Sequence, residues 1–162
     1  MKFRMRTKMF SIGDDYWIEN DSGDKVYKVD GKKLRIRKTW VIEDRGGQEL
    51  YTVREKKLAI RDTLRIERDG DTVATVRKAL ISPIHDRFKV ELKDGGELKA
   101  KGSIMDHQYK IERDGKRIAE VSKKWFKIRD TYGIEIDDSE NAALILAAAV
   151  CIEELARGGD AD

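Results

Sequence analysis

The sequence is poor in cysteine and proline and has no long hydrophobic run. Its single cysteine, Cys151, excludes an intramolecular disulfide, and its place in an apolar stretch predicts a small buried side chain in a protein of the reducing cytoplasm. The single proline, Pro83, leaves the strands predicted below with their backbone donors intact. The continuous apolar stretch, residues 142–152, is shorter than the roughly 20 residues that cross a bilayer, and the N-terminus lacks the apolar core of a secretory signal. We therefore expect no transmembrane span and no export.

Charged and hydrophobic residues are equally abundant and alternate along the chain. Each class makes up 40% of the 162 residues, and the charges do not gather in long blocks, which argues against a disordered chain. The length fits one domain with one core. We assign this domain to residues 1–157, followed by a disordered tail at 158–162. The net charge of +3, with 31 acidic residues, argues against a nucleic-acid partner.

A repeated dipeptide, an apolar residue followed by glutamate, organises the chain. It recurs about every 24 residues, at Ile18-Glu19, Ile42-Glu43, Ile66-Glu67, Val90-Glu91, Ile111-Glu112 and Ile134-Glu135. All copies but the last are followed by a turn rich in aspartate and glycine and then by a second alternating run. The repeating unit is therefore a strand, a tight turn, a second strand and a connector.

These hairpins, with an opening and a closing strand, predict about twelve antiparallel strands between residues 3 and 137. The segment 139–156 is predicted to be a helix, because it begins with capping residues, is rich in alanine and leucine and ends before glycine. Its middle is apolar on every face and must be buried all round. A closed sheet of about twelve strands leaves a central space that such a helix fills. We predict a mainly β fold, a closed antiparallel barrel around a hydrophobic C-terminal helix; a helix packed on an open sheet is the alternative.

Several segments carry a resemblance to a known family. They are MKFRMR at 1–6, FSIGDD at 10–15, VSKKWF at 121–126, RDTYG at 129–133, YGIEI at 132–136 and DSENAALILAAAVCI at 138–152. Together they resemble the LURP-one-related family, which belongs to the tubby C-terminal-like superfamily with the phospholipid scramblases. The resemblance implies a twelve-stranded barrel around a C-terminal helix. The resemblance provides no catalytic motif that could be assigned to residues of this chain. Tubby domains bind phosphoinositides and scramblases move lipids, so a phosphoinositide-like ligand or scramblase-like lipid handling is implied by the resemblance alone.

The sequence offers little for catalysis, and we expect a non-catalytic protein without a cofactor or a metal site. The two histidines, His85 and His107, both lie in predicted connectors. They would have to converge to form a metal site or an acid–base pair, and we expect them to be solvated instead. The glycine-rich turns contain neither a phosphate-binding loop nor a dinucleotide fingerprint.

Charge is separated along the repeat, because the turns are mostly acidic and the predicted connectors, residues 28–38, 54–62, 77–87, 99–107 and 123–130, are basic. The connector cations predicted to form a basic rim for an anionic surface are Lys32, Lys33, Arg35, Arg37, Lys56, Lys57, Arg61, Lys123, Lys124, Lys127 and Arg129. The competing interpretation is that they only solvate the connectors and protect sheet edges. The aromatic residues near these cations, which we expect in the core, are Trp40, Trp125, Phe126 and Tyr132.

Two functions follow from these patterns and stay open. The first is a cytoplasmic module, peripheral to the membrane, that binds anionic phospholipid headgroups through the basic rim. The second is a structural or protein-interaction barrel that has a protein partner and no small ligand.

Overall fold

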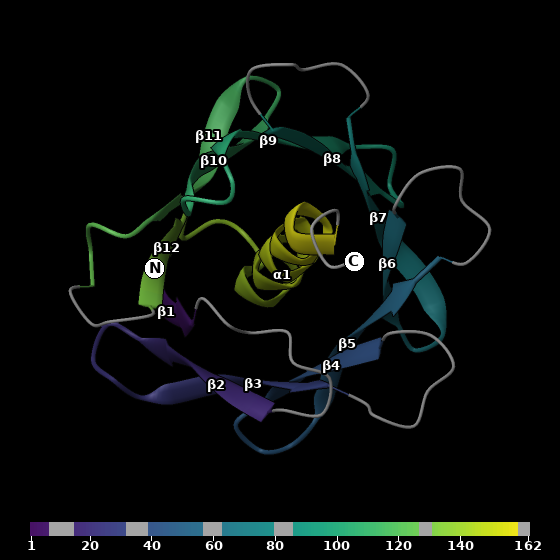
Figure 1. Cartoon of the computed structure of the whole chain (residues 1–162). Helices are drawn as coiled ribbons and strands as arrows, with labels where there is room; N and C mark the ends of the chain where they lie inside the picture. Colours follow the sequence, from purple (N-terminus) through teal and green to yellow (C-terminus); the bar gives the residue numbers. More distant parts are fainter. Residues whose placement is uncertain (7–14, 32–38, 57–62, 80–85, 127–130, 159–162) are drawn as a thin grey trace.

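Within the residues that the structure describes, 1–6, 15–31, 39–56, 63–79, 86–126 and 131–158, twelve antiparallel strands close into a barrel around one helix (Figure 1). The structure is a computed structural model. The strands are β1 (Lys2–Arg6), β2 (Asp15–Asn20), β3 (Lys25–Gly31), β4 (Thr39–Asp44), β5 (Glu49–Glu55), β6 (Thr63–Arg68), β7 (Asp71–Lys78), β8 (Asp86–Leu92), β9 (Glu97–Ser103), β10 (Gln108–Arg113), β11 (Lys116–Ser122) and β12 (Thr131–Ile136), and the helix is α1 (Ala142–Gly158). Each strand pairs with its neighbours in sequence, and β1 closes the barrel against β12. The predicted fold class is confirmed.

Four of the six copies of the repeated dipeptide mark a β-bulge. The pairing register shifts between its two residues at Ile18/Glu19, Ile42/Glu43, Ile66/Glu67 and Ile111/Glu112. All four isoleucines are 0% exposed, which places them inside the barrel. A bulge increases the local twist of a strand, and strands in a closed barrel must coil and tilt. The repeat therefore supplies core side chains and curvature at the same positions.

The hairpin turns lie at one end of the barrel, because every strand is antiparallel to its neighbours. We call this end the turn end; it carries residues 21–24, 45–48, 69–70, 93–96 and 114–115. The opposite end, where β9 leads into β10 and β11 into β12, is the connector end. In the turn between β6 and β7, Asp69 and Gly70 have φ values of 52° and 85°. Two consecutive positive φ values are the geometry of a tight two-residue hairpin.

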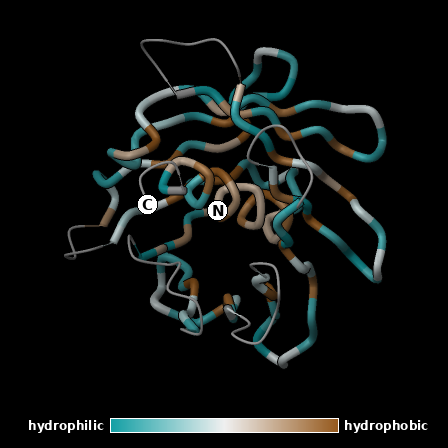
Figure 2. The backbone as a smooth tube through the Cα atoms, turned by 45° about the vertical axis from the view of Figure 1, so that its right-hand side comes forward, coloured by the Kyte–Doolittle hydropathy of each residue, from teal (hydrophilic) through white to brown (hydrophobic). Residues whose placement is uncertain are grey.

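Helix α1 runs through the barrel from the turn end toward the connector end, packed closest against β5–β8 (Figure 1). Its hydrophobic residues form a continuous stretch inside the barrel, whereas hydrophobic and hydrophilic residues alternate along the strands (Figure 2). Asn141 caps the helix, because its Oδ1 accepts a hydrogen bond from the Leu144 N–H at 3.2 Å. The helix thus begins later than predicted and includes Gly158; the rest of the predicted tail lies outside the described residues. In the described part of the chain, no helix has the length and apolarity to span a membrane.

Candidate anion-binding site

Three cations of the predicted basic rim lie within the described residues. Lys56, Lys123 and Lys124 are exposed at the connector end. The Lys124 ammonium lies 5.2 Å from the centre of the Trp125 ring, within the range of a cation–π contact. The other rim cations lie outside the described residues: Lys32, Lys33, Arg35, Arg37, Lys57, Arg61, Lys127 and Arg129.

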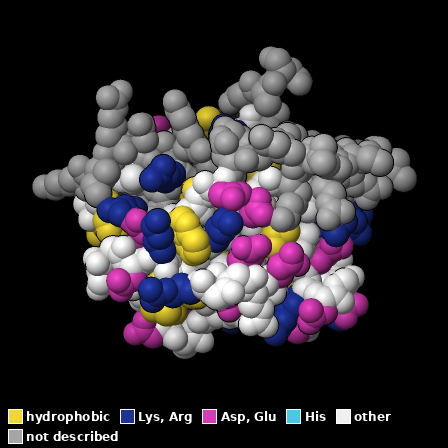
Figure 3. Space-filling model, turned by 90° about the horizontal axis from the view of Figure 1, so that it is seen from below, with side chains coloured by type: hydrophobic (Ala, Val, Ile, Leu, Met, Phe, Trp, Pro, Cys, Tyr) yellow, Lys and Arg dark blue, Asp and Glu magenta, His cyan; other side chains and the backbone are white. Residues whose placement is uncertain are grey.

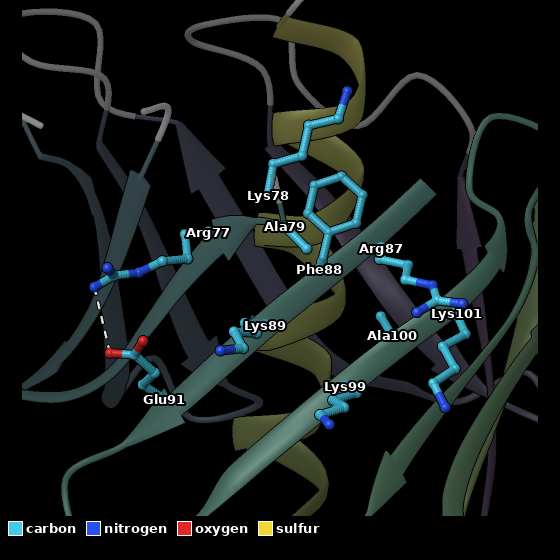
Figure 4. Close-up of a pocket in the computed structure, with 10 residues that line it drawn as sticks. All are labelled: Arg77, Lys78, Ala79, Arg87, Phe88, Lys89, Glu91, Lys99, Ala100 and Lys101. Atoms are coloured by element: carbon cyan, nitrogen blue, oxygen red, sulfur yellow. Dashed lines mark hydrogen bonds and ion pairs between the residues drawn. The ribbon is translucent and has the colours of Figure 1, made fainter. Parts of the chain in front are cut away.

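The outer wall of β7–β10 carries a second group of cations. We define this basic face by Arg77 of β7, Arg87 and Lys89 of β8, Lys99 and Lys101 of β9, and Lys110 of β10. All but Lys110 are drawn in Figure 4. They point outward because strand residues alternate between the two surfaces of a sheet, and their neighbours Val76, Val90 and Ala100 are buried in the barrel.

The predicted connectors were too long on this side of the barrel, and this part of the prediction was wrong. Arg77, Arg87, Lys99 and Lys101 belong to strands instead of connectors. The hydrogen-bonded ladder continues past them, because Arg77 pairs with Lys89, and Arg87 with Lys101. Their charge therefore lies on the wall of the barrel and not only at its rim.

The basic face places like charges opposite one another across the sheet. Lys89 lies opposite Arg77 on one side and opposite Lys99 on the other. Lys101 likewise lies opposite Arg87 in β8 and opposite Lys110 in β10. Directly opposed like charges destabilise a sheet, by roughly 0.2–1 kcal/mol for each pair. The free protein therefore holds the basic face at an energetic cost.

Other parts of the wall oppose unlike charges at some positions and single like-charged pairs at others, such as Arg54 opposite Arg65 and Glu120 opposite Glu135. Lys2 lies opposite Glu135, and Arg4 lies opposite Glu19 with an ion pair between their side chains. The wall formed by β2–β5 also shows Lys and Arg side chains interspersed with Asp and Glu (Figure 3). The arrangement on β7–β10 differs in that four basic cross-strand pairs adjoin one another across these strands.

Carboxylates neutralise only part of the basic face. Ion pairs join Arg77 to Glu91 at 3.3 Å, Lys89 to Glu97 at 3.8 Å and Lys101 to Glu112 at 3.1 Å. Within the described part of the chain, no carboxylate forms an ion pair with Arg87, Lys99 or Lys110. Since Arg87, Lys99 and Lys110 are also exposed, the basic face is positive and open to solvent.

A groove of about 420 Å³ crosses the basic face over β7–β9 (Figure 4). Among the lining residues that the structure describes, the cations are Arg77, Lys78, Arg87, Lys89, Lys99 and Lys101, and Glu91 is the one acidic residue. This volume lies within the range of small-ligand sites. A groove of this charge can bind an anion through charge-assisted hydrogen bonds.

Aromatic residues cover the outer wall of β12 next to the rim. A Cβ atom on Gly133 would lie 2.8 Å from the Phe126 ring and 3.1 Å from the Trp125 ring, so glycine is required for this packing. Trp125 and Phe126 are half-buried outside the barrel, and their predicted place in the core was wrong. The same prediction is confirmed for Trp40 and Tyr132, which are 1% and 0% exposed.

A buried carboxylate interrupts the apolar surface of α1 near the connector end. Glu153 is 3% exposed, and its Oε1 accepts hydrogen bonds from the Tyr109 hydroxyl and from Nδ1 of His107, each at 3.1 Å. The His107 ring stacks on Tyr132 with the ring centroids 4.3 Å apart. The expectation of a solvated His107 was therefore wrong; His85 lies outside the described residues.

Three tyrosines surround this carboxylate and remain protonated. Burial raises the pKa values of Tyr16, Tyr109 and Tyr132 well above 10.0, and the negative charge of Glu153 raises them further. They lie on β2, β10 and β12, and Tyr109 and His107 hydrogen-bond to Glu153 of α1. This cluster fastens the helix to the barrel wall.

A family model described as LURP-one-related matches residues 1–153, from β1 into α1. The chain belongs to the LURP-one-related family. Among solved structures, an X-ray structure of a protein from Arabidopsis thaliana is similar, with a TM-score of 0.70 and 16% sequence identity over 96% of this chain and 92% of that chain. At this identity the likeness concerns the fold alone. The search of curated proteins found no match.

The two polar features of this LURP-one-related barrel have different chemistry. The cluster around Glu153 is closed, and its hydrogen bonds are made within the protein. The basic face is exposed and only partly neutralised. Of these two features, the basic face is the one that can meet a ligand from solution.

Proposed function

We propose that this LURP-one-related protein is a non-catalytic peripheral module that binds anionic phospholipid headgroups at a membrane surface. The observation that carries the proposal is the opposition of like charges on the basic face, where Lys89 lies between Arg77 and Lys99. Such an arrangement costs stability in the free protein, and an anionic surface would relieve the repulsion.

The electrostatic gain is large enough for binding. Each basic group near an anionic bilayer contributes about 1 kcal/mol, and the effect fades beyond a Debye length of roughly 8 Å at physiological salt. The cations of the basic face together therefore supply several kcal/mol of attraction. Because this attraction is screened, binding should weaken as salt is added.

The two ends of the barrel favour one orientation on a bilayer. Arg87 and Lys101 lie at the connector-end side of the basic face, and Lys56, Lys123 and Lys124 are exposed at the same end. The turn end instead exposes aspartates, including Asp69, Asp94 and Asp114, which an anionic surface repels. The expected approach is with the connector end and the β7–β10 wall toward the lipid.

Co-sedimentation with phosphatidylserine-containing vesicles tests the proposal. We expect the wild type to pellet with these vesicles at low salt, to be released by added salt and to ignore phosphatidylcholine vesicles. A Lys89→Glu and Lys99→Glu variant should lose binding, because it exchanges two attractive charges for two repulsive ones, each worth about 1 kcal/mol.

The matched control changes the same charge at the turn end. Lys93 and Lys116 are exposed beside hairpin turns, and a Lys93→Glu and Lys116→Glu variant should bind as the wild type does. If the wild type ignores acidic vesicles at low salt, or the folded Lys89→Glu and Lys99→Glu variant binds equally well, the lipid function is wrong. A structural or protein-interaction barrel would then take its place.

A further inference from the structure

The short connector between β9 and β10, residues 104–107, joins the surface of the barrel to α1. Met105 of this connector is 49% exposed, whereas Ile104 is 0% exposed. The connector ends at His107, whose Nδ1 bonds to Glu153 of α1. We infer that the connector and Glu153 form a latch: when His107 leaves Glu153, the connector relaxes and the last turn of α1 opens, while the rest of the barrel stays folded. The latch does not depend on the lipid function proposed above.

The backbone of His107 is held in a left-handed conformation, with a φ of 54°. This conformation is unfavourable for a residue with a Cβ atom, so the surroundings of His107 must hold it there. Asp69 and Asp114 also have positive φ values, but aspartate tolerates this region and each precedes a glycine in a hairpin turn. His107 instead precedes a strand, and its side chain bonds to the helix.

Two side-chain contacts hold His107 in place. Its Nδ1 donates a hydrogen bond to Oε1 of Glu153 at 3.1 Å, and its ring stacks on Tyr132 with the centroids 4.3 Å apart. Its backbone N–H also donates to the Ile104 carbonyl oxygen at 3.0 Å, which closes the connector into a turn. When the bond to Glu153 breaks, the left-handed backbone loses its main polar restraint and can return to a more favourable conformation.

The strands on either side of the connector cannot absorb the strain. Gly102 lies opposite Tyr109 with a φ of 136°, and a Cβ atom on it would lie 2.6 Å from the Gln108 carbonyl oxygen and 2.8 Å from the Tyr109 Cα. The strands therefore approach as closely as glycine allows. Ile104 is fixed in the core at the other end. Relaxation is therefore confined to residues 105–107.

Glu153 connects the latch to the last turn of α1. Within residues 153–157, the buried side chains are those of Glu153 and Leu155, and the others are partly exposed. Without His107, the carboxylate keeps its bond from the Tyr109 hydroxyl but loses one donor. An ionised group that is buried with fewer hydrogen bonds is unfavourable. The carboxylate is then drawn toward water, which loosens the turn at residues 154–157.

The latch gives the surface a route to the core. Because Met105 is exposed in the connector, a partner that binds the relaxed form of the connector shifts the population toward the open latch. Linkage works in both directions, so opening at α1 strengthens the binding of that partner by the same factor.

Native-state hydrogen exchange of the whole protein, followed by NMR, tests the latch with His107→Gly. This variant removes the ring and tolerates either backbone conformation. Exchange should quicken in two segments, residues 105–108 and residues 154–157. We expect the rise there to exceed that in β4 and β5 by at least about ten-fold, which corresponds to about one hydrogen bond.

Ile66→Ala is the control, because it destabilises the core on β6 without touching the latch. Its exchange should quicken together in all amides that exchange by global unfolding, with no preference for the two segments. If His107→Gly gives this same uniform pattern, or leaves residues 154–157 unchanged, the latch is wrong.

A double-mutant cycle in urea denaturation tests the coupling between the connector and the helix. His107→Gly should lower the unfolding midpoint of the wild type, and should lower that of Glu153→Leu clearly less, because the bond is already lost there. Glu153→Gln keeps the size and one acceptor oxygen, so in that background the loss should be intermediate. Equal effects of His107→Gly in all backgrounds would overturn the inference.

Discussion

Leu146 lies in the middle of α1, and its replacement by aspartate tests whether the helix is a core element. The side chain is 0% exposed. The substitution forfeits the burial of leucine, about 1.5–3 kcal/mol, and places an unpaired carboxylate among apolar side chains, at a cost of about 3–5 kcal/mol. These losses equal much or all of the stability of a typical domain, about 5–15 kcal/mol. We expect the Leu146→Asp chain not to fold.

Urea denaturation followed by circular dichroism measures the effect against two graded controls. Leu146→Met conserves volume and should cost less than about 1.5 kcal/mol, whereas Leu146→Ala should cost about 2–5 kcal/mol. Both controls should unfold cooperatively, with midpoints in that order. A soluble Leu146→Asp variant that melts cooperatively near the wild-type temperature would refute the account of α1 as the centre of the core.

Three further predictions concern buried polar groups. Glu153→Leu leaves the Tyr109 hydroxyl without its acceptor, so we expect a loss of about 1–3 kcal/mol in urea denaturation; a double-mutant cycle with Tyr109→Phe that is strictly additive would contradict the hydrogen bond. Burial raises the pKa values of Tyr16, Tyr109 and Tyr132, so their stabilisation is complete below about pH 10 and is lost as pH rises above it. An ultraviolet titration in which every tyrosine ionises before unfolding would contradict this. Burial also raises the pKa of the Cys151 thiol, so thiol reagents should label the native protein slowly, and rapid labelling would show that the thiol is accessible.

The barrel could be predicted from the sequence because the residues that specify each hairpin lie close together in the chain and recur in every unit. Each hairpin carries its own turn signal, such as Asp69-Gly70, and its own inward residue, such as Ile66. The helix could also be predicted from a local pattern, because a helix that is apolar on every face must be buried. A reader of the sequence could therefore count strands and place the helix without knowing any long-range contact.

The basic face could not be predicted in the same way, because it depends on cross-strand register. Lys89 and Lys99 belong to one hairpin, but whether they lie opposite each other depends on how its turn closes. Arg77 joins them only through the pairing of β7 with β8, across a connector. A shift by one residue would turn either side chain to the other surface of the sheet.

The cluster around Glu153 was missed for a related reason. Glu153 directly follows the apolar stretch of the helix, and the sequence alone suggests that the helix becomes exposed to solvent from this residue on. Its partner His107 is 46 residues away along the chain, in a short connector with a φ of 54°. Only closure of the barrel brings the two together. A pattern that could have indicated it is the set of inward tyrosines at the connector end.

An NMR titration with phosphatidylserine bicelles tests the central claim most directly, because it reports where an anionic lipid surface meets the protein. The account predicts salt-sensitive shifts of backbone amides in β7–β9, strongest near Arg87, Lys99 and Lys101, and additional shifts near Lys123 and Lys124 at the connector end. Phosphatidylcholine bicelles should leave these amides unchanged. Shifts confined to the turn end, or no shifts at low salt, would contradict the assignment of the basic face as the lipid-binding surface.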